Sequence, residues 1–316
     1  MRRLAWALPA LALALTACAG AGPEVTHAFR GPTGTPSSAA RSPSPVPTPV
    51  MTTKPPASAR PENSGTSGTA GGKDTRPPAV PAGSDGGPGR FPPTARGVLD
   101  GKIILVDPGH NGGNAAAPSI INRLIWNGRE SETCDTTGTE TDGGYTEAQF
   151  NWNVARYVTA DLRAEGGTVV LTRTSNTGVG PCVTQRAAIG NAAHANAAVS
   201  IHADGGPANG QGFAILEPVA DGTNNAIVGP SATLGADLRA AFAAGTGEPT
   251  SSYDGVDGIQ PRDDLGGINL STVPKVFIEC ANMRNSSDAA LVTSRVWQAR
   301  AARAIATGLT KFVTSH

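Results

Sequence analysis

The chain has 316 residues with 25 basic and 25 acidic side chains, so its formal net charge at pH 7 is zero. The charge is uneven, because residues 1–100 contain 10 Lys and Arg against 5 Asp and Glu, whereas residues 101–316 contain 15 against 20. The acidic C-terminal part argues against nucleic acid as the partner, since phosphate binding requires a basic surface.

The first 18 residues have the features of an export signal. A basic "MRR" precedes the apolar "LAWALPALALAL", which is shorter than the ~20 residues of a membrane-spanning helix. The following "LTAC" resembles the lipobox of bacterial lipoproteins, in which the cysteine is acylated. We therefore expect a lipoprotein signal peptide over residues 1–18, with lipid attachment at Cys18 and a location at the outer face of the cytoplasmic membrane. The alternatives are a plain signal peptide and, less in keeping with the length, a retained transmembrane helix.

Residues 19–98 have the composition of a spacer. They are rich in Pro, Gly, Ser and Thr, as in "SPSPVPTPV". Such a segment buries too little apolar surface to offset the entropy of ordering it. We expect a disordered spacer here and one folded catalytic domain over residues 99–316.

The folded part alternates short apolar runs with helical periodicity. The first helix of the folded part is expected to begin at Glu147, because Thr146 and Gln149 have the spacing of a capping box. Strands are predicted at 102–107, 167–173, 197–203, 212–217 and 275–280, and helices at 147–165, 183–195, 231–244 and 288–312. This alternation predicts an α/β domain with a mostly parallel sheet.

Polar residues stand where these strands end. His110 follows the first strand, His202 and Glu279 end later ones, and Glu147 opens the first helix. Ligands of open α/β sheets bind beyond the carboxyl ends of the strands, and a catalytic zinc site needs three protein ligands and one open position. Alternatives exist for single residues: His110 as a turn residue, Glu147 as an acid favoured by the helix dipole, and His202 as a partner of a carbonyl group. Glu279 is harder to explain structurally, because burying an unpaired carboxylate is costly.

Two cysteines lie in polar segments that contain glycine. Cys134 and Cys182 are expected to form a disulfide in an exported protein, the alternative being two unpaired thiols in loops. Cys280 stands in an apolar run and is expected to be a buried free thiol. The segment 114–144, which contains Cys134, is expected to border the cleft.

Several motifs occur in a specific order over residues 101–314. They are "ILVDPGHNGG", "GYTEAQFNWNVA", "TRTSN", "QRAAIGNAAHANAAVSIHADG" and "PKVFIECANMRN". Together they resemble the zinc-dependent N-acetylmuramoyl-L-alanine amidases with a type-3 amidase domain. The resemblance implies a twisted sheet flanked by helices on both faces. It also implies that His110, Glu147 and His202 ligate one Zn²⁺, and that Glu279 is the catalytic carboxylate.

The implied reaction is hydrolysis of peptidoglycan at the amide bond between N-acetylmuramic acid and the L-alanine of the stem peptide. Glu279 would act as general base and then general acid for zinc-activated water. Asp107 is expected to have a structural role near His110, and His194 no catalytic role. Relatives often have glycine where Ala281 stands. Two other functions stay open, a zinc peptidase cutting within the stem peptide and a non-catalytic wall-binding lipoprotein. A monomer is favoured, with the oligomeric state left open.

Overall fold

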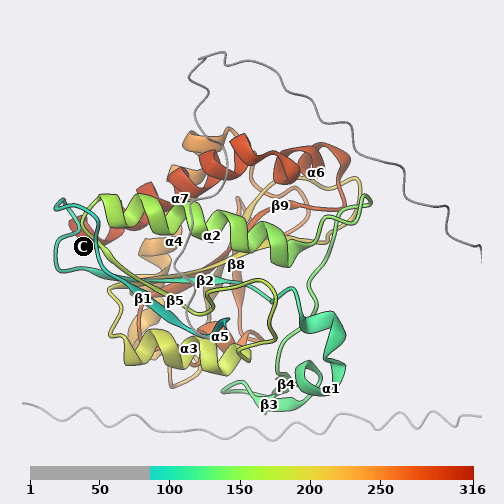
Figure 1. Ribbon diagram of the computed structural model, residues 1–316, viewed down its shortest axis with the longest axis horizontal. Coiled ribbons are helices and arrows are strands. Elements are labelled where there is room, and N and C mark those ends of the chain that lie inside the picture. The colour runs from blue at the N-terminus through green and yellow to red at the C-terminus, as the bar shows by residue number, and fades with distance from the viewer. Residues whose placement is uncertain (1–85) are drawn as a thin grey trace, which may run out of the picture. The chain divides into compact units, whose positions relative to one another are not determined.

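Seven strands form one mixed sheet in the computed structural model, which describes residues 86–316. Their order is β1 (Gly89–Phe91), β5 (Thr168–Leu171), β2 (Ile103–Pro108), β6 (Ala197–Asp204), β9 (Lys275–Asn282), β7 (Ala214–Pro218) and β8 (Ile259–Arg262) (Figure 1). The central strands β5, β2, β6 and β9 are parallel. β7 is antiparallel to β9, and β1 is antiparallel to β5. The mostly parallel sheet predicted from the sequence is confirmed.

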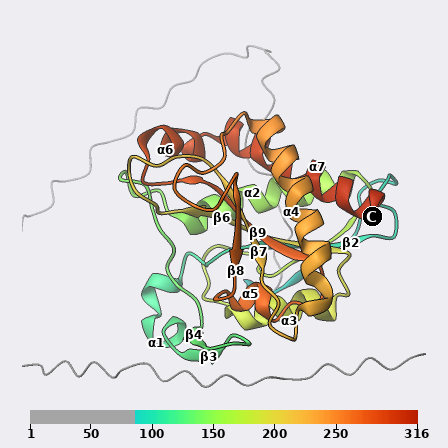
Figure 2. The same ribbon diagram turned by 180° about the vertical axis from the view of Figure 1, so that it is seen from behind.

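Helices cover both faces of this sheet. One face carries α2 (Glu147–Ala164), α4 (Asn225–Thr246) and α7 (Arg295–Ser315), whose apolar side chains share one large core with the sheet. α6 (Ser286–Thr293) precedes α7, and Figure 2 shows α4 crossing α7. The other face is covered, among the described residues, by the short helices α3 (Val183–Ala192) and α5 (Gly266–Asn269) (Figure 1). The second face is therefore the less covered one.

Strand alternation decides which side chains reach the less covered face. Ile104 and Val106 of β2 pack in the large core, whereas Leu105 packs with residues of α3. Because successive side chains point to opposite faces, Asp107 lies on the α3 side. The same alternation places further residues on this side: Ser200 and His202 of β6, and Lys275, Phe277 and Glu279 of β9.

The observed starts of the helices agree in part with the starts predicted from the sequence. α2 begins at Glu147, and the Thr146 hydroxyl accepts a hydrogen bond from the Gln149 N–H at 3.4 Å, as predicted. The Gln149 side chain does not return to Thr146, because it bonds Asn153 and Asn176 instead. The single helix expected at 288–312 is two helices, since Ser294 ends α6 and caps the start of α7.

The folded part begins earlier than residue 99, where the sequence had placed the boundary. β1 pairs with β5 from Gly89 to Phe91. A three-residue edge strand followed by two prolines has no periodicity that a sequence pattern can show, so the predicted spacer extended too far. The predicted signal peptide, Cys18 and residues 19–85 of the predicted spacer lie outside the described residues. Among the helices that are described, none combines the length and hydropathy that a membrane span needs.

The segment 114–144 has little regular structure. It contains α1 (Pro118–Ile121) and the strands β3 (Leu124–Trp126) and β4 (Ser131–Thr133), which form a separate two-stranded sheet. A disulfide between Cys134 and Cys182 joins this segment to the start of α3. Cys280 is a buried free cysteine. The segment is thus attached to the less covered face of the main sheet.

Candidate active site

His110, Glu147 and His202 converge at the carboxyl ends of β2 and β6. Oε1 of Glu147 lies 3.2 Å from Nε2 of His110 and 2.9 Å from Nδ1 of His202. One potential ligand atom from each residue lies within 4.8 Å of the other two. The structure therefore brings together three side chains that are far apart in the sequence and that share the donor atoms zinc prefers.

Each of the three side chains is held by its own surroundings. His110 follows β2 with a φ of 56°, a conformation that is uncommon for residues other than glycine. The His202 ring stacks on Phe277 of the neighbouring strand, with centroids 5.0 Å apart and an interplanar angle of 14°. Glu147 is buried, and its Oε2 accepts a hydrogen bond from the Thr139 N–H at 2.9 Å. The three side chains are therefore positioned by the surrounding strands and by residue 139.

Two glycines leave room for these side chains. A Cβ atom on Gly109 would lie 2.1 Å from Cε1 of His202, so the glycine of "DPGH" is required by the approach of the second histidine. A Cβ on Gly138 would lie 2.7 Å from Glu147 Oε2 and from His110 Cδ2, and Gly138 also has a positive φ of 74°. The backbone at residue 138 thus passes directly over the candidate ligands.

Glu279 lies beside this cluster. It is the register partner of His202 between the parallel strands β6 and β9. Its Oε2 is buried without a hydrogen-bond partner among the described residues. Burial and the nearby Glu147 and Asp204 carboxylates raise the pKa of Glu279 well above its usual range. A buried carboxylate without a hydrogen-bond partner is unusual in a folded protein. A cation bound nearby would stabilise its charged form.

The charges around the two imidazoles suit a divalent cation. Burial lowers the pKa of His110, but the Glu147 and Asp135 carboxylates outweigh it and raise the pKa to about 10. These carboxylates stabilise a positive charge at the ring, and a bound metal ion would take the place of the ring's proton. Burial lowers the pKa of His202, which favours the neutral ring that binds metals. The opposite ring nitrogens have partners, because Nδ1 of His110 lies 3.1 Å from Asp135 Oδ1 and Nε2 of His202 lies 3.2 Å from Ser200 Oγ. Partners of this kind orient ligating imidazoles, and the residues present therefore fit zinc.

A buried ionic network lies beneath the cluster. Asp107 accepts hydrogen bonds from Arg186 Nη1 at 2.9 Å and from Lys275 Nζ at 3.0 Å. Burial raises the pKa of Asp107, but Lys275 and Arg186 outweigh it and lower the pKa far below its usual range. Arg186 Nη2 also donates to the carbonyl oxygen of His110 at 2.9 Å. Asp107 thus has the structural role expected from the sequence, because it anchors the arginine that holds the His110 turn.

Replacing Lys275 with Met is expected to destabilise the protein by about 3–5 kcal/mol, because breaking a buried ion pair leaves the other charge less compensated. Lys275 is 0% exposed. The measurement is urea unfolding in the presence of a chelator. Arg129→Met is the control, since Arg129 and its partner Asp263 both lie at the surface, with side chains 44% and 53% exposed, and this pair should contribute at most about 1 kcal/mol. Equal, small losses in both variants would show that the buried pair does not stabilise the fold.

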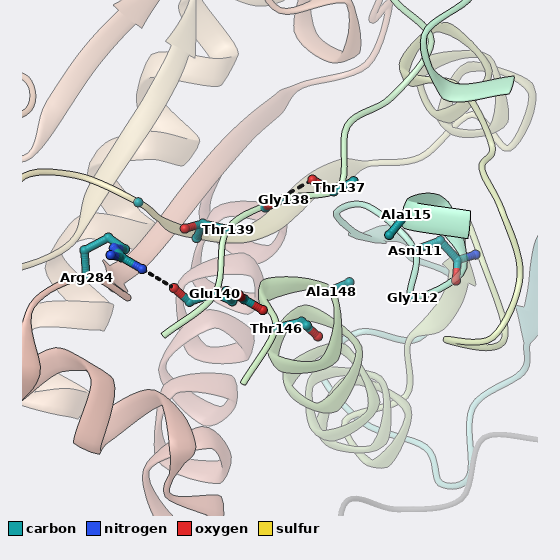
Figure 3. A pocket seen from close by; sticks show the side chains of 11 residues that line it. Asn111, Gly112, Ala115, Thr137, Gly138, Thr139, Glu140, Thr146, Ala148 and Arg284 are labelled. Atoms are coloured by element: carbon teal, nitrogen blue, oxygen red, sulfur yellow. Dashed lines mark hydrogen bonds between the residues drawn. The ribbon is translucent and has the colours of Figure 1, made fainter. Parts of the chain in front are cut away.

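Two of the openings that adjoin the cluster are large enough to take substrate groups. A cavity of about 310 Å³ is lined by His110, Glu147, His202 and Glu279, together with Arg262 and Asp204. A groove of about 550 Å³ lies along residues 137–140 and shares Gly138, Thr139 and Gly205 with that cavity. Figure 3 shows Arg284 on one side of the groove and Asn111 on the other. A substrate bound at the cluster therefore has space for its further groups on both sides of residues 137–139. Segment 114–144 borders both openings, as expected from the sequence.

Several residues around the candidate ligands were missed by the sequence analysis. Asp135, Gly138 and Thr139 lie in the irregular segment, where no periodicity places side chains. Arg186 and Lys275 carried a detectable signal, since a charged residue within a helix or strand that faces the core requires a partner. His194 is exposed next to the end of α3 and lines neither of these openings.

Known proteins resemble this chain over the whole region that carries the site. The family pattern named Amidase_3, N-acetylmuramoyl-L-alanine amidase, matches residues 104–311. The N-acetylmuramoyl-L-alanine amidase Rv3717 of Mycobacterium tuberculosis is 38% identical over 219 residues, which cover 69% of this chain and 89% of that protein. The crystal structure of the amidase Ami1 from Mycobacterium smegmatis is similar with a TM-score of 0.65 and 40% identity, over 69% of this chain and 99% of that chain. Apo Ami1 from Mycobacterium abscessus gives a TM-score of 0.64 and 38% identity, over 68% and 99%.

Proposed function

The chain belongs to the N-acetylmuramoyl-L-alanine amidase family, and from this premise we propose how its residues carry out the hydrolysis. It is a peptidoglycan hydrolase that cleaves the amide bond between N-acetylmuramic acid and the L-alanine of the stem peptide. The proposal adds that His110, Glu147 and His202 hold one zinc ion per domain and that Glu279 is the catalytic carboxylate. The observation that carries it is the convergence of the three donor atoms beside the unpartnered carboxylate of Glu279.

The division of labour follows from the positions of the side chains. Zinc bound by these ligands supplies a Lewis acid that polarises the substrate carbonyl and lowers the pKa of a water molecule. Glu279, which lines the cavity beside the three ligands, takes the proton from the attacking water and later donates it to the nitrogen of the departing L-alanine. Ser200 keeps the His202 ring oriented, and Thr139 keeps the Glu147 carboxylate in place.

Digestion of purified peptidoglycan tests the choice of bond. An amidase releases intact stem peptides from the glycan, and mass spectrometry should find L-alanine at the N-terminus of the released peptides. A peptidase acting within the stem would leave alanine attached to muramic acid. A wall-binding protein without activity would release nothing, although it would sediment with the wall.

Replacing Cys18 with Ser is expected to release the protein from membranes. The proposal that Cys18 is acylated rests on the "LTAC" sequence after the apolar segment. Two hydrophobic anchors are needed for stable membrane attachment, and a diacylated cysteine provides them. The measurement is the share of protein in the membrane fraction of an expressing bacterium, with Cys280→Ser as the control. Unchanged retention of the Cys18→Ser variant would contradict lipid anchoring and leave the hydrolase assignment intact.

A further inference from the structure

The two ring nitrogens of His110 have different surroundings. Nε2 faces Glu147, whereas Nδ1 lies 3.1 Å from Asp135 Oδ1 and 3.2 Å from Thr136 Oγ1. A carboxylate on the second nitrogen fixes both the tautomer and the orientation of a ligating imidazole. His110 needs such support, because its positive φ is unfavourable for a residue with a side chain. Asp135 is placed to hold the ring with Nε2 toward the other ligands.

Asp135 is in turn held by Arg186. Its Oδ2 accepts a hydrogen bond from Arg186 Nη2 at 3.0 Å, and the same nitrogen donates to the His110 carbonyl oxygen at 2.9 Å. Its Oδ1 also accepts the Thr136 N–H at 2.7 Å. Asp135 and Arg186 are both buried. One guanidinium thus fixes the carboxylate behind the His110 ring and the backbone that carries it.

The Cys134–Cys182 disulfide joins the two segments that provide this pair. Cys134 directly precedes Asp135, and Cys182 is the N-cap of α3, one turn before Arg186. The Val183 N–H donates to the carbonyl oxygen of Cys134 at 2.8 Å, so the backbones also meet at this point. Asp135 stands in a segment with little regular structure, and the covalent bond attaches it to a helix of the main domain.

We propose that Asp135 positions His110 for metal binding and that the Cys134–Cys182 disulfide holds Asp135 in that position. This inference rests on the proposed function, in which His110 is a zinc ligand. The disulfide then acts on the metal site as well as on the stability of the chain. Its removal weakens zinc binding even in a protein that stays folded.

The test measures the dissociation constant of zinc by competition with a chelator. The full chain is compared with Asp135→Asn, with the pair Cys134→Ser and Cys182→Ser, and with all three changes combined. Asp135→Asn is expected to weaken zinc binding about 10- to 100-fold, as found for partners of ligating histidines. The cysteine pair should weaken it by a smaller factor, since the bonds from Arg186 remain. The combined variant should bind about as weakly as Asp135→Asn alone, because both changes act through one carboxylate.

Two controls separate positioning from general loss of stability. Asp237→Asn removes another buried carboxylate, on α4 at the opposite face of the sheet, where it pairs with Lys311; its zinc affinity should equal that of the unchanged chain. Urea unfolding of each zinc-free variant shows whether it is folded under the assay conditions. If the serine pair does not fold, Cys134→Ala with Cys182→Ala replaces it, and Asp135→Asn with the disulfide intact still tests the first half of the proposal.

The outcomes distinguish this inference from the proposed function. Unchanged zinc affinity in Asp135→Asn or in the folded cysteine variant overturns the inference. Two effects that simply multiply in the combined variant also overturn it, because the disulfide would then act independently of Asp135. An unchanged chain that binds no zinc at all would instead overturn the proposed zinc mechanism.

Discussion

A Glu279→Gln variant is expected to be folded and to contain zinc, yet to have activity reduced by about 10²- to 10⁴-fold, the usual contribution of a general acid and base. Glutamine keeps the size of the side chain but accepts no proton. Glu279 has the required position, because it is the register partner of His202 and lines the same cavity as the three candidate ligands. The measurement is the rate of stem-peptide release at saturating substrate, together with zinc content.

Glu217→Gln is the matched control for that experiment. Glu217 lies on β7, the strand next to β9, and burial raises its pKa to about 7, but it lines none of the openings at the site. This variant should keep full activity. Near-normal turnover in Glu279→Gln would remove the proposed role of Glu279, and loss of zinc along with activity would assign it to metal binding instead.

Replacing His110 or His202 with Ala is expected to remove zinc and activity together. Losing a ligand should cost more affinity than losing a ligand's supporting partner, so a decrease of more than about 100-fold is expected. The measurement is elemental analysis after dialysis against a weak chelator, followed by the peptidoglycan assay. The exposed His194 serves as the control, because His194→Ala should keep one zinc ion per chain.

Two results of the same experiment would contradict this assignment. Full zinc occupancy in His110→Ala or His202→Ala would show that the ion binds elsewhere. A variant that loses zinc but retains its activity would show that hydrolysis does not require the ion.

The arrangement of the central sheet could be predicted because its strands coincide with apolar runs. Alternating strands and helices dictate parallel neighbours, and polar residues that end such strands must meet at one edge. This is why His110, His202 and Glu279 could be placed together without a structure. The edge strands β1 and β8 have the sequences GRF and IQPR, which form no apolar run.

The support of the site was less predictable, for a physical reason. Asp135 and Gly138 belong to a segment whose course is set by a disulfide and by contacts with other parts of the chain. Local sequence patterns carry no information about such contacts. The predicted Cys134–Cys182 pair was the one signal that brought this segment near α3, but it did not reveal that Asp135 reaches the His110 ring.

Anomalous diffraction at the zinc absorption edge from crystals of the zinc-loaded protein tests the metal site most directly. We expect one strong peak, within bonding distance of His110 Nε2, Glu147 Oε1 and His202 Nδ1. A map with no peak between these three atoms, or with its peak on other residues, would contradict the zinc site on which the proposed mechanism depends.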